Sequence, residues 1–255
     1  MWKKRIYVVH TPLQKQNIIM AFQYLDAINQ VFIKQSVELL QELTGGLIET
    51  PNKYSIEDPN HMRLLFAAEQ SDLCMASLFK TGRPFEFMIL DNYNQPCCKV
   101  VRELNICACM CAFDCPCDCT HYYTELKDMM GQTLGFVADN FSPCCRKSFT
   151  VYDAQREPML HIQSPFCVYQ NCICSGDVVM PVTRISNGEE IATLNKVFGD
   201  LLKECCTVAD TYRIDYFGSV DCTTKLLLIM AVLVLDIMLY DSHEEKKDDN
   251  PINIG

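Results

Sequence analysis

The sequence predicts a mainly β protein, an antiparallel sandwich or barrel that includes one apolar C-terminal helix. Short apolar or alternating segments follow one another, and turn signals such as Asp58-Pro59-Asn60 and Asn187-Gly188 separate them. No alternation of strands with helical segments is visible, which argues against a doubly wound α/β fold. The third observation is the stretch from Lys225 to Tyr240, the most apolar in the chain.

The first patterned segment, from Tyr24 to Leu43, has two interpretations. Its apolar residues recur at near-helical spacing, whereas the β-branched residues Val31, Ile33 and Val37 favour a strand within residues 31–40. Periodicity does not separate these alternatives, and both stay open.

The middle of the chain is predicted to contain short strands, followed by a short helix over Phe198–Cys206. Alternation, β-branched residues and flanking turn residues mark each strand. The predicted strands are Asn52–Asp58, Met62–Glu69, Phe85–Leu90, Lys99–Arg102, Tyr122–Leu126, Thr133–Ala138, Ser148–Tyr152, Met159–Gln163, Phe166–Tyr169, Val178–Arg184 and Ile191–Asn195.

The C-terminal run is apolar on all sides, so a helix there must be buried or in lipid. From Leu226 to Tyr240 it would be about 22 Å long, shorter than the ~30 Å core of a bilayer. Asp236, directly after Leu235, adds a further cost in lipid. We therefore expect residues 225–240 to form a helix inside the β structure. Residues 24–240 form the predicted domain, between an N-terminal extension (1–23) and a charged tail (241–255).

Composition limits the function. The chain has 255 residues, of which 49% are hydrophobic and 21% charged, so a disordered protein is not expected. A net charge of −10 argues against nucleic-acid binding. The apolar part of the N-terminus is too short for a signal peptide, so we expect cytosolic exposure and reduced thiols. Nucleophile motifs, P-loops and dinucleotide fingerprints are absent, so an enzyme is not the predicted class.

Seventeen cysteines are the anomaly in the composition, and six of them cluster. Three interpretations stay open: a site for Zn²⁺ or another soft metal, a buried strand face, and S-acylation, in which several acyl chains anchor a protein stably. The clustered cysteines are Cys107, Cys109, Cys111, Cys115, Cys117 and Cys119.

Several segments, in order from about residue 24 to 240, resemble motifs of the phospholipid scramblase family. Examples are N-K-Y-x-I at Asn52–Ile56, F-A-A-E at Phe66–Glu69 and R-P-F at Arg83–Phe85. Further matches are Gln35–Gly45, Cys115–Cys117, Lys147–Val151, Ser164–Cys167, Gly176–Val178, Ala209–Asp210 and Leu235–Tyr240. The ordered set is highly specific.

The resemblance implies a tubby-like fold, a closed antiparallel β-barrel of about twelve strands around a buried hydrophobic C-terminal helix. It also implies calcium-triggered, ATP-independent, bidirectional movement of phospholipids between leaflets. Attachment to the cytoplasmic face of the plasma membrane would use palmitoylated cysteines and the helix, whose residues include Leu226, Leu235, Asp236 and Tyr240.

Two regions depart from the family pattern. The family's twelve-residue calcium loop aligns with residues 208–219, where Val208 and Ser219 replace the terminal acids. Asp210, Asp215 and, in a shifted register, Asp221 remain as acids, so we expect weak Ca²⁺ binding at most. The family's Pro-rich N-terminal region has no counterpart, so SH3 and WW partners are not expected.

The alternative function is a membrane-docked scaffold that binds lipid or protein without scrambling. One short helix carrying Asp236 gives headgroups no polar path, so transport would need homo-oligomers or a thinned membrane.

Overall fold

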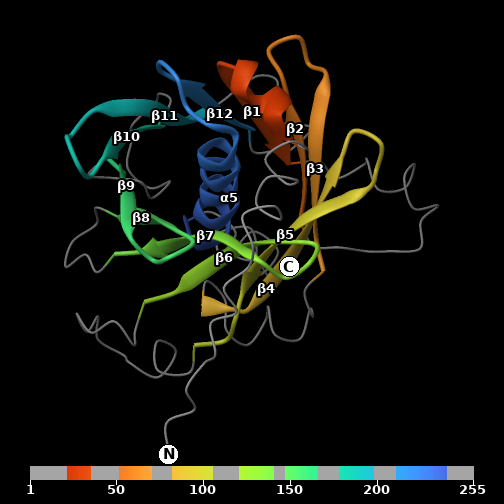
Figure 1. Ribbon diagram of the computed structural model, residues 1–255, viewed down its shortest axis with the longest axis horizontal. Coiled ribbons are helices and arrows are strands. Elements are labelled where there is room, and N and C mark those ends of the chain that lie inside the picture. The colour runs from red at the N-terminus through yellow and green to blue at the C-terminus, as the bar shows by residue number, and fades with distance from the viewer. Residues whose placement is uncertain are drawn as a thin grey trace, which may run out of the picture.

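Twelve strands form a closed antiparallel barrel around one helix in the computed structural model, which confirms the predicted fold (Figure 1). The structure describes residues 22–35, 52–70, 82–105, 121–140, 147–165, 178–197 and 211–239. The elements are η1 (Gln23–Ala27), β1 (Gln30–Gln35), β2 (Lys53–Glu57), β3 (Arg63–Glu69), β4 (Phe85–Asp91), β5 (Pro96–Arg102), β6 (Tyr123–Asp128), β7 (Thr133–Asp139), β8 (Ser148–Asp153), β9 (Pro158–Gln163), β10 (Val178–Arg184), β11 (Glu190–Val197), β12 (Thr211–Tyr216) and α5 (Cys222–Leu239).

Each strand pairs with its neighbours in sequence, and β1 closes the barrel by pairing with both β2 and β12. In the register, Ile33 of β1 lies opposite Tyr212 of β12 on one side and Ile56 of β2 on the other. The described strands therefore leave no sheet edge open for pairing with another chain.

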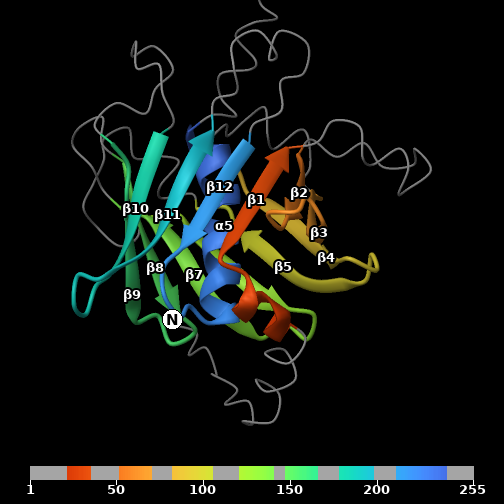
Figure 2. The ribbon, with the colours of Figure 1, turned by 90° about the horizontal axis from the view of Figure 1, so that it is seen from above.

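The up-and-down order gives the barrel two different ends. Turns at residues 58–62, 92–95, 129–132, 154–157 and 185–189 all lie at one end, here called the hairpin end, together with η1 and the start of α5. Figure 2 shows η1 and the β10–β11 turn at this end. The connections after β1, β3, β5, β7, β9 and β11 leave from the opposite end.

Helix α5 fills the barrel because its side chains are apolar on every side and nearly all are buried. Alternate side chains of the strands, such as Phe87 and Val100, point inward against it. Gly135 of β7 permits the close approach: a Cβ there would lie 2.8 Å from a methyl of Leu227. No helix among the described residues is both long and apolar enough to cross a membrane.

The helix begins three residues before the predicted Lys225, because Asp221 caps it. The Asp221 carboxylate accepts hydrogen bonds from the Thr224 backbone N–H (3.0 Å) and from the Thr224 hydroxyl (2.6 Å). Lys225 then donates to the carbonyls of Leu25, Asp26 and Ile28. These bonds fix η1 and the start of α5 to each other.

Two other expectations change. Residues 30–35 are a strand, so the helical alternative for the segment from Tyr24 is wrong there, because Val31 and Ile33 alternate toward the core. Thr211–Tyr216 is a strand that the sequence did not predict, and Tyr212 and Ile214 point inward from it. The predicted Phe166–Tyr169 and Phe198–Cys206 lie outside the described residues.

Candidate functional site

Three of the motif segments meet in one buried network at the opposite end of the barrel. Arg83 of R-P-F forms a two-pronged ion pair with Glu69 of F-A-A-E, and its Nη2 lies 3.2 Å from Glu69 Oε2. The amide of Asn52, from the N-K-Y segment, donates to the same oxygen at 2.7 Å. Because the three groups are buried and hydrogen-bond one another, they join β2, β3 and β4. This network of Asn52, Glu69 and Arg83 is called the charged lock below.

Arg102 extends this network across β5. Its Nε donates to the Arg83 carbonyl at 3.0 Å, and its guanidinium lies 4.4 Å from the centroid of the Phe85 ring. Burial lowers the pKa of Arg102 to about 10, which leaves it charged at neutral pH. A positive charge is thus enclosed at this end.

Asp236, the buried carboxylate of α5, is held by two tyrosines of the barrel. Tyr212 donates to its Oδ1 at 2.5 Å, and Tyr54 donates to its Oδ2. Lys196 lies over the Tyr212 ring, 5.4 Å from the centroid. Of the predicted helix residues, Leu226 and Leu235 are also buried, and Tyr240 lies outside the described residues. The carboxylate therefore joins the helix to β2 and β12.

The structure gives two of the candidate calcium ligands other partners. The Asp215 carboxylate on β12 accepts from Gln30 (2.5 Å), Asn195 (2.9 Å) and Arg213 (2.9 Å), and Asp221 caps α5. Asp210 lies outside the described residues. Within the described ranges, no three His, Cys, Asp or Glu side chains are grouped so that they could hold a metal ion.

The six clustered cysteines, Cys107, Cys109, Cys111, Cys115, Cys117 and Cys119, lie outside the described residues. They belong to the connection between Arg102, where β5 ends, and Tyr123, where β6 begins. Both of these strand ends are at the opposite end of the barrel.

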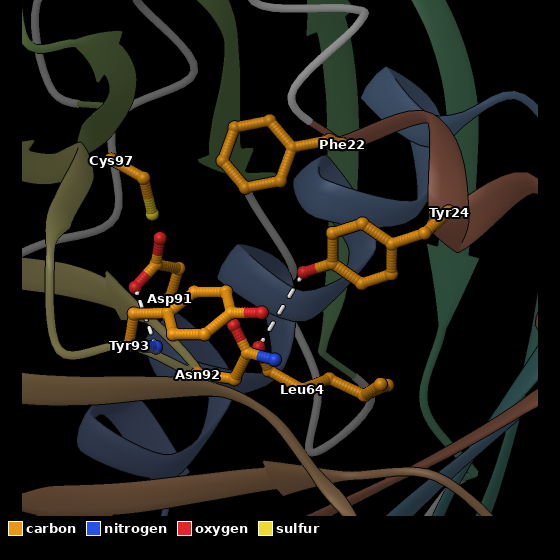
Figure 3. A pocket seen from close by; sticks show the side chains of 7 residues that line it. All are labelled: Phe22, Tyr24, Leu64, Asp91, Asn92, Tyr93 and Cys97. Atoms are coloured by element: carbon orange, nitrogen blue, oxygen red, sulfur yellow. Dashed lines mark hydrogen bonds between the residues drawn. The ribbon is translucent and has the colours of Figure 1, made fainter.

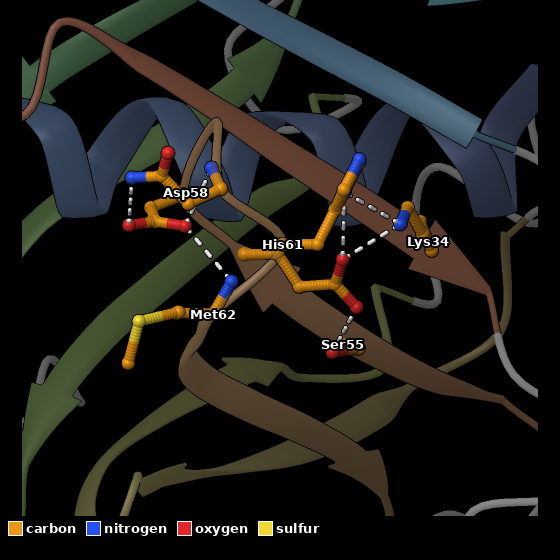
Figure 4. Close-up of polar contacts among 7 residues, drawn as sticks. Lys34, Ser55, Asp58, His61 and Met62 are labelled. Atoms are coloured by element: carbon orange, nitrogen blue, oxygen red, sulfur yellow. Dashed lines mark hydrogen bonds and ion pairs between the residues drawn. The ribbon is translucent and has the colours of Figure 1, made fainter.

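At the hairpin end, four turns repeat one hydrogen-bonded form. An Asp at the strand end accepts backbone N–H bonds, at 2.7–2.9 Å, from the residues two and four positions later. The residue three positions later has a positive φ in each turn. Figure 4 shows the first of these turns, with Asp58, His61 and Met62, beside Lys34 of β1 and Ser55 of β2. The four Asp residues are Asp58, Asp91, Asp128 and Asp153.

Exposed apolar side chains gather at the same end. Met130 is 80% exposed, Tyr93 78% and Met62 67%. The tip residues of the hairpin end are Tyr24, Met62, Tyr93, Met129, Met130, Ile185 and Phe217. Among the described residues, the one large exposed apolar side chain outside this set is Val179, on β10 toward the opposite end. These seven exposed apolar side chains at the hairpin end are the candidate contact surface of the described residues.

The sequence predicted several of these turns but not the exposed apolar residues at their tips. A large apolar residue within two positions of a turn Asp is the pattern that could have predicted them, as in Asp91-Asn92-Tyr93 and Asp128-Met129-Met130. Likewise, the Asn52–Glu69–Arg83 network lay inside the matched motifs, but no pairing between them was predicted.

Fold and site together define an antiparallel barrel that encloses a helix, with a buried charged network at one end and exposed apolar tip residues at the other. The family model described as Scramblase matches residues 9–242. The chain therefore belongs to the scramblase family, as its motifs predicted.

Its relatives include phospholipid scramblase 1 of Homo sapiens, 33% identical over 220 residues, which are 86% of this chain and 65% of that protein. Phospholipid scramblase 2 of Bos taurus is 31% identical over 230 residues, 90% of this chain and 74% of that protein. Phospholipid scramblase family member 5 of Homo sapiens is 30% identical over 219 residues, 86% of this chain and 76% of that protein. No solved structure matches the chain. The matched residues make up 65–76% of the length of these three relatives.

Proposed function

We propose that this protein moves phospholipids between the leaflets of a membrane, in both directions and without ATP, at the cytoplasmic face of the plasma membrane. The observation that carries the proposal is the family match over residues 9–242. The relatives named as phospholipid scramblases support it over 86–90% of this chain.

The hairpin end is the membrane-contact surface in this proposal. Helix α5 is enclosed by the barrel, so its apolar side chains are already removed from water and contribute little to lipid contact. The tip residues, by contrast, gain about 25 cal/mol for each Å² of apolar surface that they bury in lipid. Met, Tyr and Phe side chains on separate turns can enter the headgroup region independently of one another, with little change in the barrel.

Control and attachment complete the proposal. The clustered cysteines from Cys107 to Cys119 are the proposed acylation sites, with Zn²⁺ binding as the alternative. Calcium stimulation is expected to be weak, because the Asp215 carboxylate is engaged by three protein donors. Transport would use homo-oligomers or a thinned bilayer.

A dithionite assay tests the proposal. The purified protein is reconstituted in vesicles that contain fluorescent phospholipid, with and without Ca²⁺. We expect the fluorescence to fall below the half-level that protein-free vesicles retain, with little calcium dependence. The matched variants are Met130→Ser, at a tip, and Val179→Ser, an exposed apolar side chain elsewhere. The tip variant should slow the movement more.

A membrane-docked scaffold without scrambling is the second candidate. The engaged carboxylates of Asp215 and Asp221 favour it, since they leave no free calcium trigger among the described acids of residues 211–221. Tight vesicle binding with dithionite loss limited to the outer leaflet would support the scaffold and overturn the scramblase. Absence of both binding and movement would overturn both candidates.

A further inference from the structure

A cavity of about 300 Å³ opens at the hairpin end, between η1, the start of β3 and the turn that joins β4 to β5. Figure 3 shows its walls, in which aromatic rings from two elements face a carboxylate. Its lining residues are Phe22, Tyr24, Leu64, Asp91, Asn92, Tyr93 and Cys97. The volume is at the lower end of the range of small-molecule sites.

The walls are three aromatic rings and an apolar floor. Phe22 is buried, whereas Tyr24 and Tyr93 are exposed tip residues, so the cavity opens on the proposed membrane-contact surface. The Tyr24 hydroxyl is directed at the Leu64 carbonyl, 3.4 Å away. Burial raises the pKa of Tyr24, with a smaller contribution from Cys97, so its ring stays neutral at physiological pH.

The carboxylate is fixed in place by the turn. Asp91 Oδ1 accepts the backbone N–H groups of Tyr93 and Gln95, both at 2.8 Å, so the turn fixes the orientation of this lining carboxylate. None of the seven lining residues is cationic. The lining therefore presents one negative charge and aromatic faces, and the neighbouring Arg63 guanidinium is engaged by the Asn92 carbonyl at 3.2 Å and by Asn94 Oδ1 at 3.0 Å.

This combination selects a cation with an apolar surface. A quaternary ammonium group is attracted by aromatic faces and by a carboxylate, and it needs no hydrogen-bond acceptors because it has no N–H. A primary ammonium group would lose hydrogen bonds to water that the side chains of Phe22 and Leu64 cannot replace. We infer that this cavity binds a quaternary ammonium group, of the kind that ends a phosphatidylcholine headgroup.

The inference that the quaternary ammonium group belongs to a lipid rests on the proposed function, whereas the inference that the cavity binds such a cation does not. The first arm of the test uses phosphocholine in solution, followed by saturation transfer to its trimethylammonium protons and by titration. Inorganic phosphate is the second probe and should show no binding. Saturable phosphocholine binding is the expected result, and its absence, or binding of phosphate instead, would overturn the inference.

The matched variants are Asp91→Asn and Asp153→Asn. Asparagine keeps the Oδ1 acceptor that each turn needs, so both variants should fold. Asp91→Asn should weaken phosphocholine binding about threefold, because it removes a partly exposed opposite charge. Asp153→Asn, in the equivalent turn away from the cavity, should leave it unchanged. Tyr93→Leu should weaken binding by about 3–30-fold. Equal effects of the two Asn variants would contradict the assignment.

The second arm uses vesicles of phosphatidylcholine or of phosphatidylglycerol. Preference for phosphatidylcholine that Asp91→Asn reduces identifies the lipid headgroup as the source. Phosphocholine binding with no such preference identifies a soluble ammonium compound and overturns the lipid part. Dithionite assays of the same vesicles separate the two proposals: movement without phosphocholine binding overturns this inference alone, and phosphocholine binding without movement overturns the proposed function alone.

Discussion

The two ends of the barrel use charged and apolar side chains in opposite ways. At the opposite end, Arg83 and Glu69 are buried and paired with each other, and the buried Arg102 donates from its Nε to the Arg83 carbonyl. At the hairpin end, Met130 and Tyr93 extend into solvent although they could be replaced by polar residues without loss of the core. The stability of the fold explains the buried charged network but not the exposed apolar tips. The apolar tips are the proposed membrane contact, and mutations at the two ends should have different effects.

The largest expected effect is the loss of the charged lock. Replacing Arg83 by Met leaves the Glu69 carboxylate buried without its cation, which should lower the free energy of unfolding by about 3–5 kcal/mol. Urea denaturation measures this change. The control is Lys99→Met, which breaks an ion pair with Glu86 that is about a third exposed and should cost no more than about 1 kcal/mol. Equal effects would show that the lock is not structural.

Next is the attachment of α5 to the barrel. Tyr212→Phe removes a hydroxyl that donates to the buried Asp236 carboxylate, and it should destabilise the protein by about 1.5–3 kcal/mol. Tyr152→Phe, on the outward face of β8, should change the unfolding midpoint little. A midpoint shift for Tyr152→Phe as large as that for Tyr212→Phe would contradict this account of Asp236.

A third prediction concerns the close approach of helix and sheet. In Gly135→Ala the new Cβ would lie 2.6 Å from the Tyr152 carbonyl oxygen, and overpacking should cost about 1–3 kcal/mol. Gly131 lies in a turn at the hairpin end with φ +83°, and a Cβ added there would meet nothing within 4 Å. Gly131→Ala should therefore cost about 1 kcal/mol from backbone strain alone. Thermal unfolding measures both variants, and the midpoint of Gly131→Ala should fall less than that of Gly135→Ala. An equal or larger fall for Gly131→Ala would contradict this account of the close approach.

The tips should affect binding and not stability. Met130→Ser should change the free energy of unfolding by no more than about 0.5 kcal/mol, because the side chain is exposed. It should still weaken binding to phosphatidylcholine vesicles several-fold, measured by flotation. Val179→Ser should leave both quantities unchanged. Unaltered vesicle binding of the Met130 variant would remove the functional reason for the apolar tips.

The smallest effects concern two aspartates at the two ends. Backbone N–H donation, first from Met62, lowers the pKa of Asp58, so its contribution to stability is present above the unfolded pKa and is lost as the pH falls. Burial raises the pKa of Asp139, so ionisation of this group opposes folding above the unfolded pKa, and acid relieves that cost. Carboxyl ¹³C NMR should place the two values on opposite sides of 3.8. Equal values would contradict the comparison.

Local sequence patterns predicted most of the fold. Alternation and turn residues located ten of the strands, because a half-buried strand repeats its side-chain environment every two residues. Thr211–Tyr216 was not predicted as a strand because its outward-facing polar residues, Arg213 and Asp215, fall in the segment that aligns with the family's calcium loop. Strand pairing through closure, such as Ile33 opposite Tyr212, joins residues too far apart for any local pattern to show.

The candidate site was less predictable, for a physical reason. In the sequence, an exposed residue such as Met130 cannot be told from a methionine of the core. Only the folded arrangement shows that the seven apolar tip residues lie at one end. Similarly, Asp91 and Phe22 come together in the cavity through the docking of η1, which is a tertiary contact. The motifs predicted the family, and the structure shows that three of them supply Asn52, Glu69 and Arg83 to one buried network.

The most direct test of the account places a single tryptophan at each end. Trp2, the one tryptophan of the chain, is replaced by Phe, and Trp is then introduced as Met130→Trp or Val179→Trp. Brominated phosphatidylcholine vesicles quench tryptophan that reaches the acyl region. The account predicts strong quenching and a blue shift at position 130 and neither at position 179. Quenching at 179 but not at 130 would contradict it, because the barrel would then meet the membrane through its other end.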